Sequence, residues 1–253
     1  MIPFLKKEIL EQFRRKRVLL LGILFAAFAL LGVATAKLTP VIMEMFADEM
    51  AASGMSYDIK ESTIMDAWMQ FFKNAAIPLI VVIILWSGSF TSEYQKHTLI
   101  PLVTKGLSRT GIFVSKMLTA ALVWTAGYAL YLGIFYGYAE FYWGNGGVKH
   151  IALAVTLYWL YGMWLLMLLG FFSSIAGTTM QVLLGVGGVF FLVTFLELIP
   201  KLSAKLPTAL AKGLSLMQGS AETSDFTVPV IIALSCMVLC FAGGLAFMQK
   251  KEL

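Results

Sequence analysis

Residues 151–172 read IALAVTLYWLYGMWLLMLLGFF, and no side chain in this stretch is charged. The hydrocarbon core of a bilayer is about 30 Å thick, so a helix that crosses it needs about 20 predominantly apolar residues. The stretch meets that requirement in length and composition. It therefore predicts a membrane-spanning helix.

Five further segments have the same character, and the composition of the whole chain agrees with them. Of 253 residues, 59% are hydrophobic and 13% are charged, and the mean hydropathy is +0.84. Soluble domains carry about 25% charged residues. We predict an all-α integral membrane protein with a single transmembrane domain over residues 1–253. Its six expected spans are 18–36, 71–90, 112–139, 151–172, 180–199 and 228–248.

Residues 1–17 predict an amphipathic helix that lies in the membrane interface before the first span. Ile2, Leu5, Ile9 and Phe13 recur at helical spacing, and charged or polar residues, Glu8 and Gln12 among them, fill the other face. An alternative is a cleaved signal peptide, with the sequence ATA at residues 34–36 as its cleavage site. The long apolar run favours the first interpretation.

The placement of Lys and Arg predicts the orientation of the spans. With the N-terminus inside, the cytoplasmic side receives most of the 19 basic residues and every arginine. Cytoplasmic loops are enriched in Lys and Arg. We therefore expect a multi-pass protein of the cell (plasma) membrane with both termini in the cytoplasm. Anionic lipid headgroups account for the basic excess, so we expect no nucleic-acid partner.

The sequence predicts no catalytic or metal site within this chain. His97 and His150 fall on opposite sides of the membrane in the predicted topology. Cys236 and Cys240 lie four residues apart inside an apolar run, a spacing that matches no closed zinc set. We interpret both cysteines as small apolar residues of a span.

A nucleotide site is also not expected in this chain. The segment GLSRTG at residues 106–111 has the glycine spacing of a phosphate-binding loop. Ile112 and Phe113 follow where that loop requires Lys and Ser or Thr. If the protein drives transport with ATP, a partner must bind the ATP.

The predicted cytoplasmic loop at residues 91–111 carries the most distinctive pattern. It resembles the loop after the second span in permease subunits of the ABC-2 type. That loop has a Glu, a Gly-Thr-Leu, a leucine pair, a Lys-Pro-Val-Ser-Arg-like turn and a Gly-Lys that opens the third span. Three positions depart from the pattern, namely His97, Gly106 and Ser115. The matching residues are Glu93, Thr98, Leu99, Leu102, Lys105, Ser108, Arg109 and Lys116.

This resemblance implies a transmembrane subunit of an ATP-binding cassette transporter, most often an exporter. Two such subunits, identical or paired with a sister, would meet two cytoplasmic ATPase subunits that bind ATP and Mg. The loop would couple to the ATPase through Glu93, Thr98, Lys105, Ser108 and Arg109. We further expect Ser108 to cap the third span, and Glu93 to pair with Arg109 across the base of the loop.

Small residues in the spans predict close helix contacts. Gly133 and Gly137 form a GxxxG pattern, and Gly185 and Gly188 lie in the fifth span. Such positions allow helix backbones to approach closely. They indicate either packing within the bundle or a seam between two subunits.

Two other function classes remain open on sequence grounds. One is a secondary carrier or channel that needs no ATPase, although carriers usually keep ionisable groups at membrane depth and these spans have almost none. The other is a membrane protein that anchors or regulates a partner without transport. An adjacent reading frame that encodes a phosphate-binding loop would favour the ATP-driven class.

Overall fold

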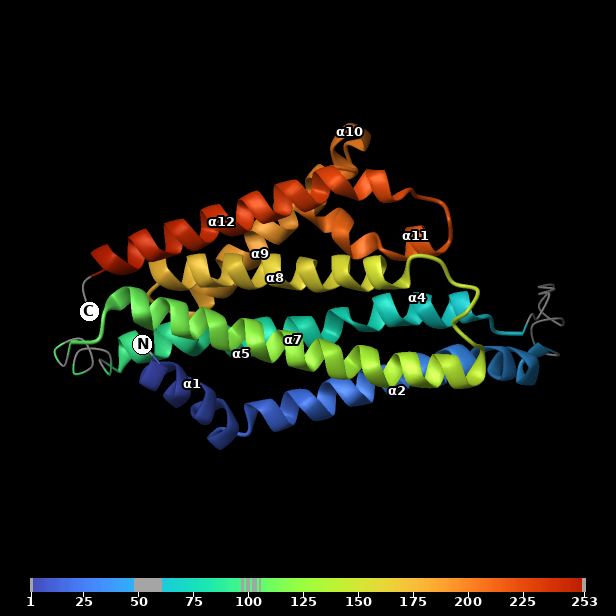
Figure 1. The fold of residues 1–253 in the computed structure, drawn as a ribbon, viewed down its shortest axis with the longest axis horizontal. Coiled ribbons are helices and arrows are strands. Elements are labelled where there is room, and N and C mark those ends of the chain that lie inside the picture. The colour runs from blue at the N-terminus through green and yellow to red at the C-terminus, as the bar shows by residue number, and fades with distance from the viewer. Residues whose placement is uncertain are drawn as a thin grey trace.

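The computed structural model describes residues 2–47, 61–96, 98, 101, 104 and 106–251. Within them the chain is helical and contains no strand, and Figure 1 shows the long helices lying side by side. Six segments are long and apolar enough to cross a membrane. The prediction of an all-α, multi-pass membrane protein is thus confirmed. The six segments are Arg17–Met45, Ile64–Gln95, Arg109–Tyr142, Ile151–Ile175, Thr179–Leu196 and Thr223–Lys250.

The helices follow one another in a simple order. The long ones are α1 (Ile2–Arg14), α2 (Arg17–Met45), α4 (Ile64–Asn74), α5 (Ala76–Gln95), α7 (Arg109–Tyr142), α8 (Ile151–Ile175), α9 (Thr179–Leu196) and α12 (Thr227–Lys250). Between α9 and α12 lie the short elements α10 (Pro200–Ser203), η1 (Pro207–Lys212), α11 (Leu214–Met217) and η2 (Thr223–Phe226).

Helices α2 and α7 are considerably longer than their predicted spans. At 1.5 Å per residue, the 34 residues of α7 measure about 51 Å, whereas a bilayer core is about 30 Å thick. The 29 residues of α2 continue through Pro40 to Met45. Both helices therefore extend beyond the hydrocarbon at one or both ends.

The predicted second span consists of two helices. α4 begins well before residue 71 because Thr63 caps it, with a reciprocal bond between the Thr63 backbone and Asp66. α4 ends at Asn74, and Pro78 explains this end, because proline has no N–H to bond the carbonyl four residues earlier. α5 then continues to Gln95.

The core is aromatic and lies between α2, α4, α7 and α8. The Phe71 ring centroid is 4.8 Å from that of Tyr131 and 5.0 Å from that of Phe135. The Tyr131 hydroxyl donates to the Phe71 carbonyl at 2.8 Å, and the Tyr128 hydroxyl donates to the Val155 carbonyl at 2.9 Å. These bonds satisfy buried hydroxyls and fix the helices relative to one another.

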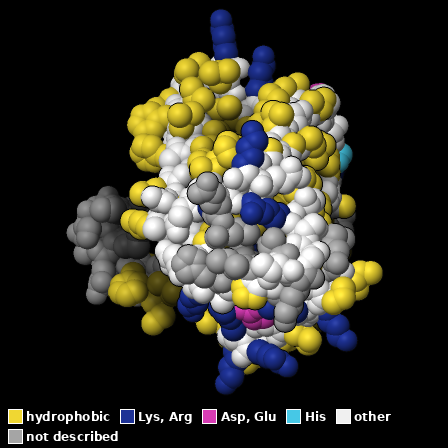
Figure 2. All heavy atoms as spheres, turned by 90° about the vertical axis from the view of Figure 1, so that its left-hand side faces the viewer, with side chains coloured by type: hydrophobic (Ala, Val, Ile, Leu, Met, Phe, Trp, Pro, Cys, Tyr) yellow, Lys and Arg dark blue, Asp and Glu magenta, His cyan; other side chains and the backbone are white. Residues whose placement is uncertain are grey.

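The start of α1, the end of α5, the start of α7 and the end of α12 lie at one end of the bundle (Figure 1). We call this the basic end. Figure 2 looks onto it and shows Lys and Arg side chains around a small acidic group. Its described basic residues are Lys6, Lys7, Arg14, Arg15, Lys16, Arg17, Lys96, Arg109, Lys116, Lys250 and Lys251.

Candidate functional site

Lys116 lies at the centre of the basic end and is only 2% exposed. Its Nζ is 3.1 Å from Glu8 Oε2 and 3.0 Å from Glu93 Oε2, and it also donates to the Ser89 carbonyl at 3.1 Å. A buried ammonium needs such partners, because burial of an unpaired charge is costly. Through these contacts Lys116 joins α1, α5 and α7.

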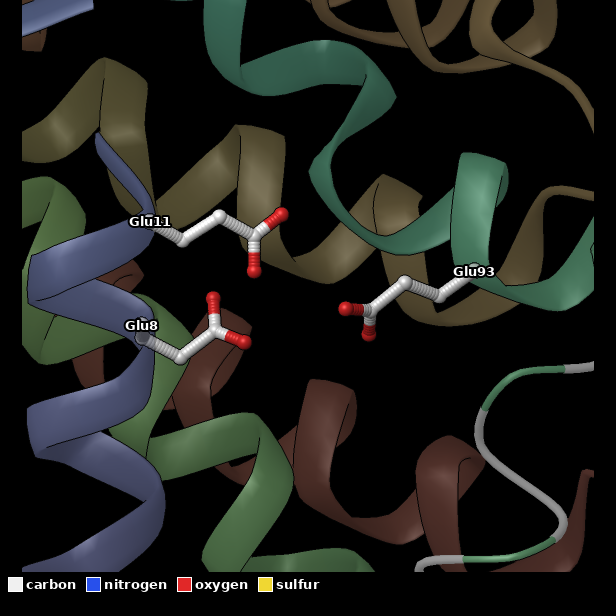
Figure 3. A group of neighbouring side chains, drawn as sticks. All are labelled: Glu8, Glu11 and Glu93. Carbon is white, nitrogen blue, oxygen red and sulfur yellow. The ribbon is translucent and has the colours of Figure 1, made fainter. Parts of the chain in front are cut away.

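Lys7 is the second cation of this site. Figure 3 shows the carboxylates of Glu8 and Glu11 on α1 and of Glu93 on α5 converging. Lys7 Nζ lies 3.1, 3.0 and 3.3 Å from oxygens of Glu8, Glu11 and Glu93, respectively. Its ammonium therefore takes the place at which a metal ion would otherwise meet three carboxylates. We call Lys7, Glu8, Glu11, Glu93 and Lys116 the ion cluster.

The electrostatics of the ion cluster keep its exposed edge charged. Burial lowers the pKa of Lys7, but the charges of Glu8 and Glu93 outweigh it and raise that pKa above its ordinary value. Burial raises the pKa of Glu11, but its hydrogen bond and charge interaction with Lys7 and the Arg15 guanidinium hold that pKa below 4.5. Arg15 Nη2 lies 2.6 Å from Glu11 Oε1.

α1 turns an unexpected face toward the bundle. Phe4, Glu8 and Gln12, four residues apart, are its buried side chains. The prediction that Glu8 and Gln12 belong to the polar face opposite the membrane-facing residues is wrong, because both side chains are buried against the bundle. The reason is Lys116, which requires a counter-charge inside the bundle. Of the apolar residues assigned to the interface, Ile2 and Phe13 are exposed, and Leu5 and Ile9 are half-buried.

The structure places four of the five predicted coupling residues at the basic end. Thr98 N–H donates to the Glu93 carbonyl at 3.1 Å. The Ser108 hydroxyl accepts from Gly111 N–H at 3.1 Å, so the predicted cap of this helix is confirmed. Lys105 lies outside the described residues. Arg109 begins α7.

The expected pair between Glu93 and Arg109 is wrong. Glu93 is paired with lysines of the ion cluster, whereas Arg109 Nη1 donates to the carbonyls of Gln249, at 3.2 Å, and Lys251. The carbonyls in the last turn of a helix and at its C-cap lack partners within that helix, so they readily accept hydrogen bonds from a guanidinium. Arg109 thus fastens the start of α7 to the end of α12.

Lys251 extends this fastening to α8. Its Nζ donates to the carbonyls of Ser174, Ile175 and Ala176 at 3.1, 3.3 and 2.6 Å. It also lies 4.0 Å from the ring centroid of Tyr94 on α5. A cation at a helix C-terminus is favourable because the last carbonyls carry partial negative charge.

Of the four glycines expected at helix contacts, one packs against a neighbouring helix within the bundle and three face open space. A Cβ on Gly185 would lie 2.4 Å from the Phe172 ring, so Gly185 packs within the bundle. A Cβ on Gly133, Gly137 or Gly188 would meet no atom within 4 Å. Bundle packing is therefore wrong for these three, and the seam between subunits remains an expectation for them.

The ion cluster was not among the sites predicted from the sequence. Its one local signal is Phe4, Glu8 and Gln12 at intervals of four, a mixed stripe that an interfacial helix does not need. Lys116, one turn after Ile112 in an apolar helix, is the matching signal on α7.

The sequence matches no protein-family model, no curated protein and no solved structure. Evidence for the function of this chain therefore comes from its sequence pattern and from the geometry of the basic end.

Proposed function

We propose that this chain is the membrane-spanning permease subunit of an ATP-binding cassette transporter of the ABC-2 type, working as an exporter. The observation that carries the proposal is the ion cluster. It links α1, α5 and α7 at the point where residues 96–108 connect α5 to α7. A displacement of that connection therefore acts on three helices together.

In this proposal the basic end faces the cytoplasm of the cell, and both termini lie there. α1 lies in the inner membrane interface, with Ile2 and Phe13 toward lipid and Phe4 toward the bundle. Two permease subunits, alike or different, pair through the open glycine faces of α7 and α9. Two separate cytoplasmic ATPases bind ATP and Mg and contact the loop through Glu93, Thr98, Lys105, Ser108 and Arg109.

Closure of the ATPases on ATP would favour one arrangement of the permease pair over another. A ligand shifts such an equilibrium only by its differential affinity for the two states. The ion cluster supplies a firm connection for that coupling, because paired and buried charges hold α1 to α5 and α7. The chain itself would carry out no chemistry.

The test is recovery of the partner. The full chain is purified from native membranes after mild crosslinking, and its companions are identified by mass spectrometry. We expect an ATPase with a phosphate-binding loop, and ATP-dependent transport when both are reconstituted. Transport by the reconstituted chain without any ATPase would instead establish a carrier or channel.

A matched pair of variants tests the site. Glu93→Gln keeps the shape of the side chain and leaves Lys116 paired with Glu8, so the bundle should still fold. We expect it to lose coupled ATP hydrolysis. Lys149→Gln, on an exposed lysine between α7 and α8, should keep it. Full coupling in Glu93→Gln would contradict the assigned role.

A further inference from the structure

A groove crosses the surface of the bundle between α5, α8 and α9. It has a volume of about 300 Å³ and is lined almost wholly by aliphatic and aromatic side chains. No charged side chain is among the described residues that line it. The lining includes Ile80 and Ile84 of α5, Tyr158 and Tyr161 of α8, and Gly187 and Phe190 of α9.

The two tyrosines are the polar groups of this groove. Tyr158 is 2% exposed and Tyr161 is 8% exposed. Their rings are held in an aromatic row, with Tyr158 stacked on Tyr128 and Tyr161 packed against Trp164. Among the described residues, neither hydroxyl has a hydrogen-bond partner, although the neighbouring Tyr128 hydroxyl has one.

An unpartnered hydroxyl is costly at this depth. Tyr158 and Tyr161 lie seven and ten residues from the start of α8 at Ile151, which is about 10 and 15 Å along the helix. Water is absent from the hydrocarbon region, so a polar group there needs another partner. A ligand with an oxygen acceptor would supply it.

We propose that the groove binds a neutral, single-chain amphiphile whose carbonyl or hydroxyl oxygen accepts hydrogen bonds from Tyr158 and Tyr161. The absence of lining charges among the described residues selects against an ionic headgroup. The volume lies at the low end of the range for ligand sites, about 300–1,000 Å³, so the groove takes part of one hydrocarbon chain, whose remainder lies in the bilayer. The chain would lie along Ile80, Ile84 and Phe190. This inference goes beyond the proposed function, since binding requires no ATPase.

The test uses monooleoylglycerol with a diazirine in its chain, added to the full protein in detergent and crosslinked by light. We expect saturable labelling of α5 and α9, with competition by unlabelled monooleoylglycerol. Phosphatidylcholine and phosphatidylglycerol should compete weakly. Non-saturable labelling, or equal competition by two-chain lipids, would show an ordinary lipid contact and overturn the proposal.

Gly187→Leu and Gly188→Leu provide a matched pair of variants. A Cβ at either position meets no atom within 4 Å, so neither change should disturb the bundle, but only Gly187 lines the groove. We expect Gly187→Leu to reduce labelling about tenfold and Gly188→Leu to leave it unchanged. If Gly187→Leu leaves labelling intact, or instead breaks a dimer that covers the groove, the proposal is wrong.

The hydroxyls are tested with Tyr158→Phe/Tyr161→Phe, which preserves both rings. Two hydrogen bonds of ordinary strength correspond to about a tenfold loss of affinity or more. The loss should appear for labelled monooleoylglycerol and not for a diazirine hydrocarbon of equal length, which makes no hydrogen bond. An equal effect on the two probes, or none on either, would show that the tyrosines do not bind the polar group.

Discussion

At the scale of the residue, Lys116 shows how this bundle tolerates a charge among apolar helices. Its ammonium has two carboxylates and one carbonyl within 3.1 Å. Glu8 lies on α1, whereas Glu93 and Ser89 lie on α5. Neutralisation of the one Lys116 ammonium therefore holds α1, α5 and α7 together. Replacing a buried ion pair by apolar groups is often harmless, whereas removing one partner is not.

We expect Lys116→Met to destabilise the protein by about 1–3 kcal/mol, because the Glu8 and Glu93 carboxylates then lose one of their two lysine partners and keep Lys7. Adding Glu8→Leu should restore most of that loss, since Lys7 still neutralises Glu11 and Glu93. Thermal unfolding in detergent measures both. Lys149→Met, on an exposed lysine, should change stability by about 0.5 kcal/mol or less. A loss below about 1 kcal/mol for Lys116→Met would show that the cluster is not cohesive.

The lowered pKa of Glu11 predicts that the contacts of α1 with the bundle lose stability at acid pH. The folded protein holds its pKa below the ordinary 4.5. The stabilisation is therefore present above about 4.5 and is lost as pH falls through the lower folded value. We expect Glu11→Gln to flatten the acid side of the stability profile, measured by thermal unfolding across that range. Profiles of identical shape for parent and variant would contradict this.

At the scale of the element, glycines separate contacts within the bundle from free surfaces. A Cβ on Gly162 of α8 would lie 2.3 Å from the Trp124 ring of α7, and that ring is fixed by a bond from its Nε1 to the Trp159 carbonyl at 3.1 Å. The same addition on Gly133 meets nothing. One residue type thus has two different roles in the same kind of helix.

We expect Gly162→Val to lower the free energy of unfolding by about 1–3 kcal/mol, because overpacking forces neighbouring helices apart. Gly133→Ala should be neutral or stabilising by up to about 1 kcal/mol, because alanine favours the helix. Thermal unfolding of the two variants checks the contrast. Similar losses in both would contradict the assignment of Gly162 to the interior.

The open face of α7 also permits a test of the proposed pairing. Gly133→Leu should leave the folded monomer intact, since its side chain enters open space. It should nevertheless reduce crosslinked dimer in native membranes if Gly133 lies in the seam. Gly147→Leu, also open but in the turn after α7, serves as the control. Unchanged dimer in Gly133→Leu would place the seam elsewhere.

At the scale of the whole molecule, apolar length predicted the six crossings and their order. It did not predict that α2 and α7 run past the membrane, because hydropathy marks where lipid ends and not where a helix ends. Ser108 was predictable as a cap from its local pattern. The ion cluster was not, since Glu8 and Lys116 lie 108 residues apart and a single sequence does not say which distant charges meet.

Cysteine labelling tests the proposed orientation of the helices in the membrane. In a Cys236→Ala/Cys240→Ala background, we expect Gly147→Cys and Ser220→Cys to react with an impermeant thiol reagent applied outside cells. Gly177→Cys, in the turn between α8 and α9, should react only after permeabilisation. All three positions are exposed in the structure. Labelling of Gly177→Cys in intact cells would reverse the proposed orientation.

The pairing of Glu8 with Lys116 also implies a delay during synthesis, because Glu8 is made long before its partner. A ribosome adds about 5–20 residues per second, so the 108 residues between them take roughly 5–20 s to make. Throughout that interval the stripe of Glu8 and Gln12 has no protein partner on α7. A nascent chain that stops before residue 116 therefore has a first helix held by α5 through Lys7 and Glu93, with Glu8 still lacking its Lys116 partner.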